Sequence, residues 1–410
     1  MAATTFDNFQ DASFRRSQTF VLVTAFLSLL AIVGFALYGL PLFYNFYIDE
    51  FGWSRKIVTS GNAYAKIFVA PLFGFLAGWI VDKYGPRKML MTGAFMTLIA
   101  FLGLSMMKSL SLFYTSYVFV ALGYVFGGPL PCQVLISRWF TKNRGKAMGI
   151  AYLGIGTGFT IVPQLVAWME KNLGWNMALV ALGVIIVLVS VPLAMFVKDS
   201  PSKTDVTIKP EPAVPIKTIL RNPWFYILAI GSMCSIGAVG GVNQHLKLYM
   251  KDLAMEDAAI ANIISLVAFM SLGGRVVMGW LADLFPRKYV MILIYLLVGG
   301  SIPILLMPDF PGRLYIFAVV FGLGLGGDYM IIPLMAGDLF GVRTLGRVMG
   351  IVLVADGIAE ATLPMLVGDL FDKFGTYNYG FIILIGLALI GTLVISWLPK
   401  RKQNLAEASA

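Results

Sequence analysis

The sequence predicts an all-α membrane protein, with twelve transmembrane helices arranged as two pseudo-symmetric six-helix bundles. Three observations predict this class: the apolar composition, the length of the apolar segments and a repeat that relates the two halves of the chain. The 410 residues are 59% hydrophobic and 13% charged, and their mean hydropathy is +0.83. A soluble globular protein has roughly 45–50% apolar and roughly 25% charged residues, so the composition excludes that class.

The apolar segments have the length of membrane-spanning helices. About 20 apolar residues cross a bilayer as a helix, whereas a spanning β-strand is about half as long and alternates in polarity. The first segment is too long for a cleaved signal peptide, so we expect it to be retained. The predicted spans are 19–46, 57–81, 89–107, 112–137, 146–168, 175–197, 223–246, 257–282, 289–307, 314–339, 346–370 and 377–398.

A polar segment divides these spans into two sets of six. Residues 198–222 are rich in proline and carry charges of both signs, which is typical of a linker without a core of its own. We therefore predict an N-terminal bundle at 1–197, a cytoplasmic linker at 198–222 and a C-terminal bundle at 223–410 that ends in a short polar tail.

The two halves repeat with a single offset. A shift of 201 positions places Gly78 on Gly279 and Asp82 on Asp283. The same shift pairs Gly145 with Gly346, Met148 with Met349, and Pro163 with Pro364. Duplicated halves are typical of secondary transporters, in which the substrate site lies near the bilayer midplane. The repeat therefore indicates transport.

The net charge of +10 follows membrane topology and does not indicate nucleic acid. With a cytoplasmic N-terminus, about two thirds of the 31 Lys and Arg residues lie in the cytoplasmic segments. This bias predicts a multi-pass protein of the plasma or inner cell membrane, embedded in the lipid bilayer, with both termini in the cytoplasm. We expect no nucleic-acid partner.

The chain lacks the residue patterns of an enzyme or a metal site. Cys132 and Cys234 both fall in apolar segments, so we expect packed thiols and no disulfide. One histidine and no clustered carboxylates give no set of metal ligands. Neither a nucleophile elbow nor a phosphate-binding loop occurs. We therefore expect no enzyme activity, no cofactor and no ATP-driven transport.

A short motif follows the spans 57–81 and 257–282. The first copy contains Gly78, Asp82 and Arg87, and the second repeats the pattern with Asp283 and Arg287 but is one residue shorter. Glycine permits close helix approach, and the carboxylate can meet a helix N-terminus or a basic residue. Stop-transfer charge alone would explain the arginines but not the repeated Gly-x-x-x-Asp. The motif resembles the signature loop of the major facilitator superfamily.

The segment from Trp139 to Gly154 carries a second resemblance. Its aromatic-Phe pair, Arg144 and following Ala-x-Gly-x-Ala-x-x-Gly resemble the corresponding loop of the monocarboxylate transporters. The other signature of that family, an acidic-Gly-x-Trp-Gly-Trp stretch before the first span, is absent. The resemblance therefore fits the bacterial branch, near the oxalate/formate-type antiporters. It implies a small monocarboxylate of lactate or pyruvate type as substrate, and protons as partners.

Arg275 is the strongest candidate for substrate binding. It lies within the apolar span 257–282, where a charge costs about 2.5–3.5 kcal/mol, and its counterpart in the first half is Gly74. A guanidinium presents a two-pronged fork to a carboxylate. The alternative is that the side chain snorkels to the cytoplasmic surface. The resemblance implies an essential arginine at this spacing before Gly279. It also implies an acid one turn earlier, where this chain has Ser271, so the proton acceptor is expected elsewhere.

Four other ionisable residues fall in apolar spans. Lys66 and Glu360 are predicted to gate transport as an ion pair, or to form a static pair. Asp328 or Asp356 is the predicted protonatable group, because a buried carboxyl group holds a proton more tightly. A counter-charge to Arg275 is the alternative role.

Polar and aromatic residues complete the predicted site. Asn243 and His245 lie toward the outer end of the span 223–246, where the histidine relays protons or forms an interfacial hydrogen bond. Aromatic substrate contacts are predicted at Tyr38, Tyr117, Tyr124 and Tyr329, with membrane-interface or packing roles as the alternative.

Together these patterns predict a monomeric secondary active transporter of small monocarboxylates, coupled to protons and working by alternating access. An organic anion antiporter of the oxalate/formate type is the first alternative, in which Arg275 and Lys66 both bind substrate. A receptor or sensor on a transporter fold is the second alternative.

Overall fold

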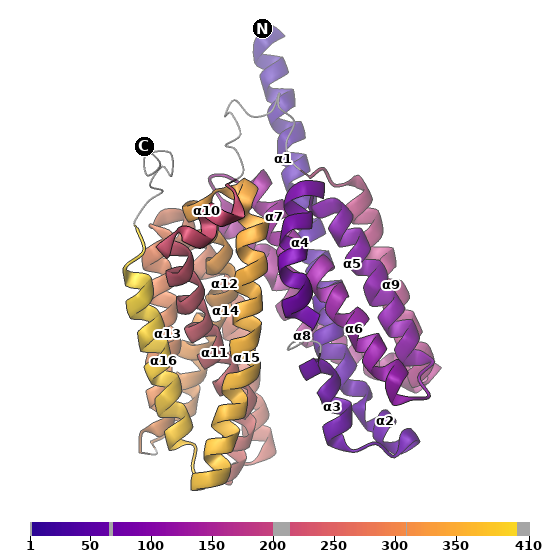
Figure 1. The fold of residues 1–410 in the computed structure, drawn as a ribbon, viewed down its shortest axis with the longest axis vertical. Coiled ribbons are helices and arrows are strands. Elements are labelled where there is room, and N and C mark those ends of the chain that lie inside the picture. Colours follow the sequence, from indigo (N-terminus) through magenta and orange to yellow (C-terminus); the bar gives the residue numbers. More distant parts are fainter. Residues whose placement is uncertain (1, 65–68, 200–213, 309, 400–410) are drawn as a thin grey trace. The chain divides into compact units, whose positions relative to one another are not determined.

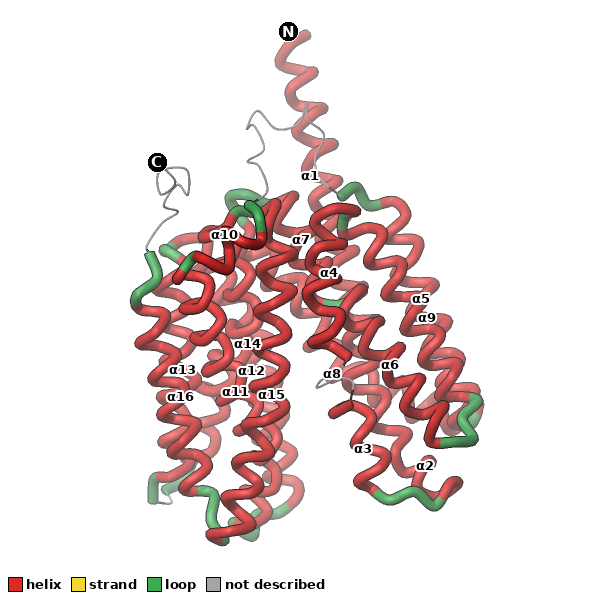
Figure 2. Tube along the Cα trace, in the orientation of Figure 1, coloured by secondary structure: helices red, strands yellow, loops and turns green. Residues whose placement is uncertain are grey.

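The computed structural model describes residues 2–64, 69–199, 214–308 and 310–399. Within these ranges the secondary structure is helical, and short loops join the helices (Figure 2). Eleven helices in the described ranges are long and apolar enough to cross a membrane. The predicted span 57–81 would be the twelfth, but it includes residues 65–68, which lie outside the described ranges. The all-helical membrane class predicted from composition is thus confirmed.

The chain forms two compact units. Unit 1 comprises Met1–Ala213 with Val342–Gly350, and unit 2 comprises Val214–Gly341 with Ile351–Ala410. Residues 342–350 therefore group with unit 1, whereas the sequence placed them in the C-terminal bundle. The reason is local: the backbone amides of Gly346 and Arg347 donate hydrogen bonds to Asp82 of unit 1.

The first predicted span lies in one long helical segment that changes from α-helix to π-helix, then to a 3₁₀ turn and back to α-helix. A π-helical stretch, η1, interrupts it and packs along α8. A Cβ on Gly34 of η1 would lie 3.2 Å from the Cα of Gly158, so the two backbones touch. This close approach requires that Gly34 and Gly158 carry no side chain. The helices of this region are α1 (Ala2–Ser28), η1 (Leu29–Gly39), η2 (Leu40–Phe43) and α2 (Tyr44–Phe51).

The rest of unit 1 follows the predicted spans with one break. The span 112–137 consists of two helices, because Gly128 adopts φ −86° and ψ −136° between them. Pro129, which follows, disfavours a helical conformation for the preceding residue. The helices are α3 (Arg55–Tyr64), α4 (Ala70–Tyr84), α5 (Pro86–Ser105), α6 (Leu110–Gly127), α7 (Pro129–Trp139), α8 (Arg144–Leu173) and α9 (Trp175–Phe196).

Unit 2 is a bundle of long helices with a short helix, α10, before it (Figure 1). Helix α16 packs beside α11 and α13, and α14 packs beside α12 and α13. The helices are α10 (Ile216–Arg221), α11 (Pro223–Asp252), α12 (Asp257–Leu284), α13 (Arg287–Leu306), α14 (Arg313–Phe340), α15 (Leu345–Phe374) and α16 (Asn378–Ser396). The 3₁₀ turn η4 (Val342–Thr344) precedes α15.

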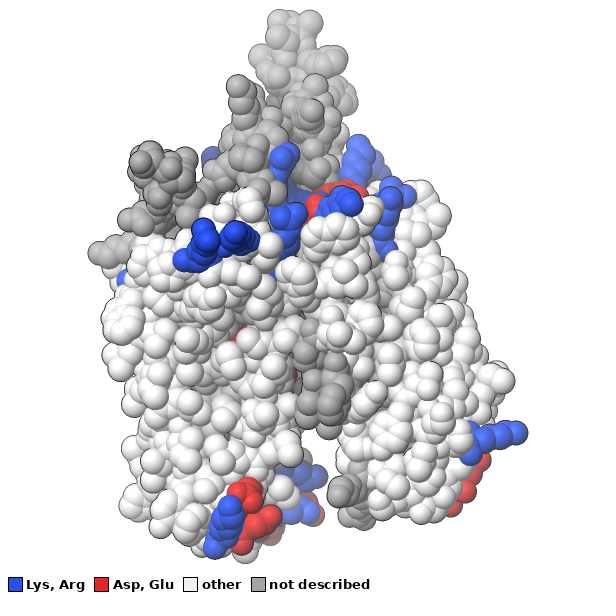
Figure 3. Space-filling model, viewed as in Figure 1, with Lys and Arg blue, Asp and Glu red and all other residues white. Residues whose placement is uncertain are grey.

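Charged side chains gather at the two ends of each unit on the face shown in Figure 3, and the surface between the ends is uncharged there. An uncharged belt is what a hydrocarbon core requires, because an exposed charge in that layer is costly. Large apolar side chains such as Leu72, Phe196 and Leu393 are 72%, 79% and 65% exposed. The surface is therefore that of a protein solvated by lipid.

Candidate functional site

Arg275 lies on the face of α12 that packs against α14. The two helices approach closely through glycine: a Cβ on Gly326 would lie 2.2 Å from the carbonyl oxygen of Ser271 and 2.8 Å from the backbone nitrogen of Arg275. The Arg275 side chain is half-buried, and its Nη1 donates a hydrogen bond of 3.2 Å to Ser271 Oγ. The guanidinium therefore projects from a tightly packed, rigid piece of backbone.

Tyr329 and Glu360 are brought together by the fold. The Tyr329 hydroxyl on α14 donates a hydrogen bond of 3.0 Å to Glu360 Oε2 on α15, and both side chains are half-buried. The sequence had assigned Tyr329 to the substrate and Glu360 to gating. In the structure the two residues form one polar contact.

Asp328 and Asp356 are buried inside unit 2, facing serines on α11. Asp328 is 0% exposed and accepts a hydrogen bond of 3.1 Å from Ser235, and Asp356 is 1% exposed and accepts one of 2.7 Å from Ser232. Neither serine was predicted from the sequence, and neither was Tyr295 on α13, whose side chain is fully buried. The spacing of Ser232 and Ser235 was a signal, because residues three apart share one helix face.

His245 forms a structural hydrogen bond. Its Nε2 lies 2.8 Å from the carbonyl oxygen of Pro364 on α15, and its ring centroid lies 5.5 Å from that of Tyr377. Since a carbonyl oxygen only accepts, the Nε2 atom carries the hydrogen. Asn243, two residues earlier on α11, is exposed.

The tyrosines of unit 1 differ in their surroundings. Tyr117 is 2% exposed, and its hydroxyl donates to that of Tyr44 at 3.4 Å inside the aromatic core. Tyr38 packs edge-on against Phe159, with 5.3 Å between ring centroids. Tyr124 is 39% exposed. Of these three, Tyr124 presents the most surface to a ligand and Tyr117 the least.

Lys66, the remaining predicted gating residue, lies outside the described ranges.

The first loop motif binds the start of a helix. Asp82 Oδ1 accepts from the backbone N–H of Gly346 and Oδ2 from that of Arg347, both at 3.0 Å. Gly78 is required here, because a Cβ would lie 2.3 Å from the Gly346 carbonyl oxygen. Asp82 lies just past the predicted span 57–81, and burial raises its pKa to about 6, against the lowering effect of the two amides, Arg138 and Arg347. This is the helix-terminus contact that the motif suggested.

The remaining motif residues bind backbone and nearby carboxylates. The Arg87 amide donates 2.7 Å to Asp199 Oδ1, and the Arg144 Nε donates 3.0 Å to the carbonyl of Phe140. In the second copy Asp283 is half-buried, and Arg287 forms an ion pair with Asp338 on α14. Each of these contacts fixes the end of a helix.

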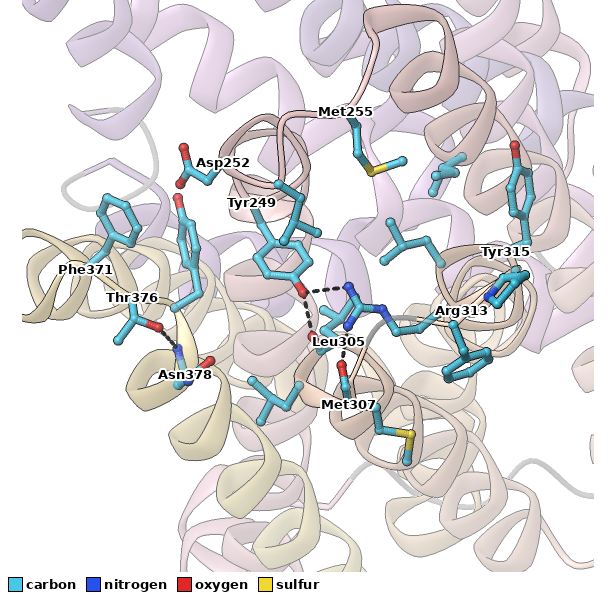
Figure 4. A pocket seen from close by; sticks show the side chains of 18 of the residues that line it. Tyr249, Asp252, Met255, Leu305, Met307, Arg313, Tyr315, Phe371, Thr376 and Asn378 are labelled. Carbon is cyan, nitrogen blue, oxygen red and sulfur yellow. Dashed lines mark hydrogen bonds between the residues drawn. The ribbon is translucent and has the colours of Figure 1, made fainter.

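A cavity of about 800 Å³ lies at the end of unit 2 where α11, α13 and α15 end and α14 begins (Figure 4). Tyr249, Asp252, Phe371 and Tyr315 line it, together with Arg313, which donates to Met307 O and to the Tyr249 hydroxyl. None of the residues predicted for the site lines this cavity. Among the described residues no group of three or more His, Cys, Asp or Glu is arranged to hold a metal ion.

Comparison with known families matches nearly the whole chain. The family model described as "Major Facilitator Superfamily" matches residues 24–283 and 246–409. Monocarboxylate transporter 13 of Bos taurus is 25% identical over 331 residues, which is 77% of this chain and 74% of the relative. The uncharacterized MFS-type transporter YcxA of Bacillus subtilis is 25% identical over 371 residues, 86% of this chain and 88% of the relative.

Solved structures show the same fold. A variant of the E. coli fucose:proton symporter FucP superposes with a TM-score of 0.73 at 15% identity, covering 92% of this chain and 98% of that one. The human organic anion transporter MFSD10 gives 0.69 at 14% identity, covering 93% and 99%. The relatives are transporters and not enzymes. This chain therefore belongs to the major facilitator superfamily of membrane transporters, and within it resembles the monocarboxylate transporters.

Proposed function

We propose that this protein carries a small monocarboxylate across the membrane together with a proton, by alternating access. One observation carries the proposal: a permanent cation, Arg275, is half-buried in the apolar helix α12. A fixed cation in a membrane helix is costly unless an anion or a polar group meets it. A guanidinium binds a carboxylate through paired hydrogen bonds, so Arg275 can recognise the head group of a small monocarboxylate.

The hydrogen bond from Arg275 to Ser271 supports this role. It holds one edge of the five-donor guanidinium in place. A small monocarboxylate could then be bound by the Arg275 guanidinium and by a short apolar contact. Tyr124, Tyr38 and Tyr329 stay predicted contacts for the apolar part, with Asn243 and Tyr117 as further candidates.

Proton coupling follows from charge balance. A carrier that binds one carboxylate and one proton adds no net charge, so its occupied state reorients without moving charge through the membrane field. Asp328 and Asp356 are the proposed proton acceptors, since both are fully buried. Lys66, Glu360 and His245 are proposed to act in gating or proton relay.

The proposal includes a topology. Both termini are placed in the cytoplasm of a cell membrane because the Lys and Arg residues concentrate on that side. The bundles at 1–197 and 223–410, joined by the linker 198–222, are the proposed moving parts of a monomer.

Uptake by proteoliposomes tests the function. Lactate and pyruvate uptake should accelerate when the outside is more acidic than the inside, and it should not need internal substrate. Arg275→Ala should abolish uptake and also abolish the thermal stabilisation by ligand, while Arg275→Lys should keep part of both because charge remains without the fork. Arg221→Ala, at an exposed arginine of α10, is the control and should behave as wild type.

Two results would count against it. Ligand stabilisation retained in Arg275→Ala would remove that residue from the site. Uptake that depends on internal counter-substrate and ignores the pH gradient would favour the oxalate/formate type of exchange over symport, and ligand stabilisation without any uptake would favour a receptor.

A further inference from the structure

Two buried carboxyl groups in unit 2, from α14 and α15, contact the same face of α11. Ser232 and Ser235 stand one turn apart on this helix and contact Asp356 of α15 and Asp328 of α14, at 2.7 and 3.1 Å. The second oxygen, Oδ2, of each aspartate is buried and has no hydrogen-bond partner. All four side chains are at least nine-tenths buried. A helix-to-helix polar cluster is thus enclosed within a single unit.

The hydrogen count at Ser232 favours a protonated Asp356. Ser232 Oγ lies 3.0 Å from the carbonyl oxygen of Ala229 and 2.7 Å from Asp356 Oδ1. A hydroxyl group carries one hydrogen, and both of these oxygens accept when Asp356 is ionised. A proton on Asp356 resolves the conflict, because the carboxyl group then donates to Ser232 Oγ and the hydroxyl hydrogen goes to Ala229.

The electrostatic surroundings favour the same state. Among the described residues no ion pair involves Asp328 or Asp356, and a buried carboxylate without a cation is costly. The two aspartates also repel each other, and Glu360 on α15 repels Asp356 further. The other titratable groups around the cluster are Cys234 on α11 and Tyr295 on α13.

We propose that Asp328 and Asp356 form one proton-binding site, and that the Ser232 hydroxyl switches its hydrogen bond with the state of that site. When Asp356 holds the proton, Ser232 donates to Ala229. When the proton leaves to water, the Ser232 hydroxyl turns and donates to the carboxylate. Ser232 is thus a positioning residue that stabilises the ionised form. The use of this site in transport rests on the proposed function, but the site itself does not.

Removing the switch has a defined consequence. Ser232→Ala removes a hydrogen bond from both states of Asp356. The bond to the ionised carboxylate is the stronger one, so the site should keep its proton to higher pH. A hydrogen bond to a charged group is strong enough to move such a midpoint by about one pH unit or more. Ser235→Ala should act in the same direction through Asp328.

Infrared titration of the purified protein without substrate tests the proposal. The carbonyl band of a protonated carboxyl group should disappear on raising the pH, and it should be reduced in Asp356→Asn and in Asp328→Asn. In Ser232→Ala the band should persist to higher pH. Ser301→Ala is the matched control: Ser301 is also fully buried and donates 2.7 Å to a backbone carbonyl three residues earlier, without a carboxyl neighbour, so its titration should match wild type.

Several outcomes would overturn the inference. An unchanged band in both asparagine variants would remove these residues from the proton site, and a titration unmoved in Ser232→Ala would remove the switch. A midpoint that shifts when sodium replaces choline would assign the charge to a metal cation instead. If an asparagine variant fails to fold, the titrations of the serine variants still test the proposal. A normal titration in a protein that moves no monocarboxylate would refute the proposed function and leave this site intact.

Discussion

Asp82 Oδ2 accepts a hydrogen bond of 3.0 Å from the backbone N–H of Arg347, and the side-chain Nε of the same arginine lies 3.5 Å from that oxygen. The two residues are 265 positions apart in the chain, yet both belong to unit 1. Asp82 accepts from two amides at the start of α15, and its side chain is only 2% exposed there.

Asp82→Ala should destabilise the protein. The Gly346 and Arg347 amides at the start of α15 would lose their acceptor, and the loss of a helix-capping side chain costs about 1–2 kcal/mol. The melting temperature in detergent should therefore fall. Asp369→Ala is the control, because Asp369 forms an exposed pair with Lys373 four residues away, and such pairs contribute little. Equal melting temperatures for the two variants would contradict the prediction.

The stability contributed by Asp82 should depend on pH. Burial raises its pKa from 3.8 to about 6, so the folded state binds the proton more tightly than the unfolded state. This proton-linked part of the contribution is fully present below about pH 4 and is lost as the pH rises through 6, whereas the carboxylate still accepts from the two amides. Asp82→Asn, which cannot ionise, should lack this loss. Melting temperatures measured from pH 4 to pH 7 should then converge or cross between the two proteins, and parallel curves would refute the assignment.

Gly326→Ala should disrupt the α12–α14 contact that holds Arg275. The added Cβ would lie 2.2 Å from the backbone oxygen of Ser271, and backbone has little freedom to move away. Overpacking of this kind costs about 1–3 kcal/mol or more. Gly273→Ala, on the same helix as Arg275, meets nothing within 4 Å and is the control. Melting temperature and substrate affinity should both fall in the first variant only.

Ser271→Ala should weaken substrate binding without unfolding the protein. Ser271 Oγ accepts a hydrogen bond of 3.2 Å from Arg275 Nη1, and the loss of that bond leaves the guanidinium less ordered. We expect an increase in KM of about three- to tenfold, with the maximal rate nearly unchanged, because roughly 1 kcal/mol of ordering is lost. Unchanged KM in proteoliposome uptake would show that Ser271 does not position Arg275.

The sequence was sufficient to predict the architecture, because the number and length of the helices depend on the order of apolar and polar residues along the chain. The apolar runs and the 201-residue repeat predicted the helical membrane class. The Asp82 motif even indicated its kind of partner. These features depend on residue type and spacing alone, since an apolar run of this length has one stable form in a membrane.

The pairings inside the bundles were decided by the tertiary structure. Asp328 and Tyr329 are neighbours in sequence, yet Asp328 faces Ser235 on α11 and Tyr329 faces Glu360 on α15. The same holds for Tyr117, which the sequence predicted as a substrate contact but which lies in the aromatic core. A helix that is apolar on all sides carries no periodic signal of its inward face, so its rotation about its own axis is set only by packing against neighbouring helices.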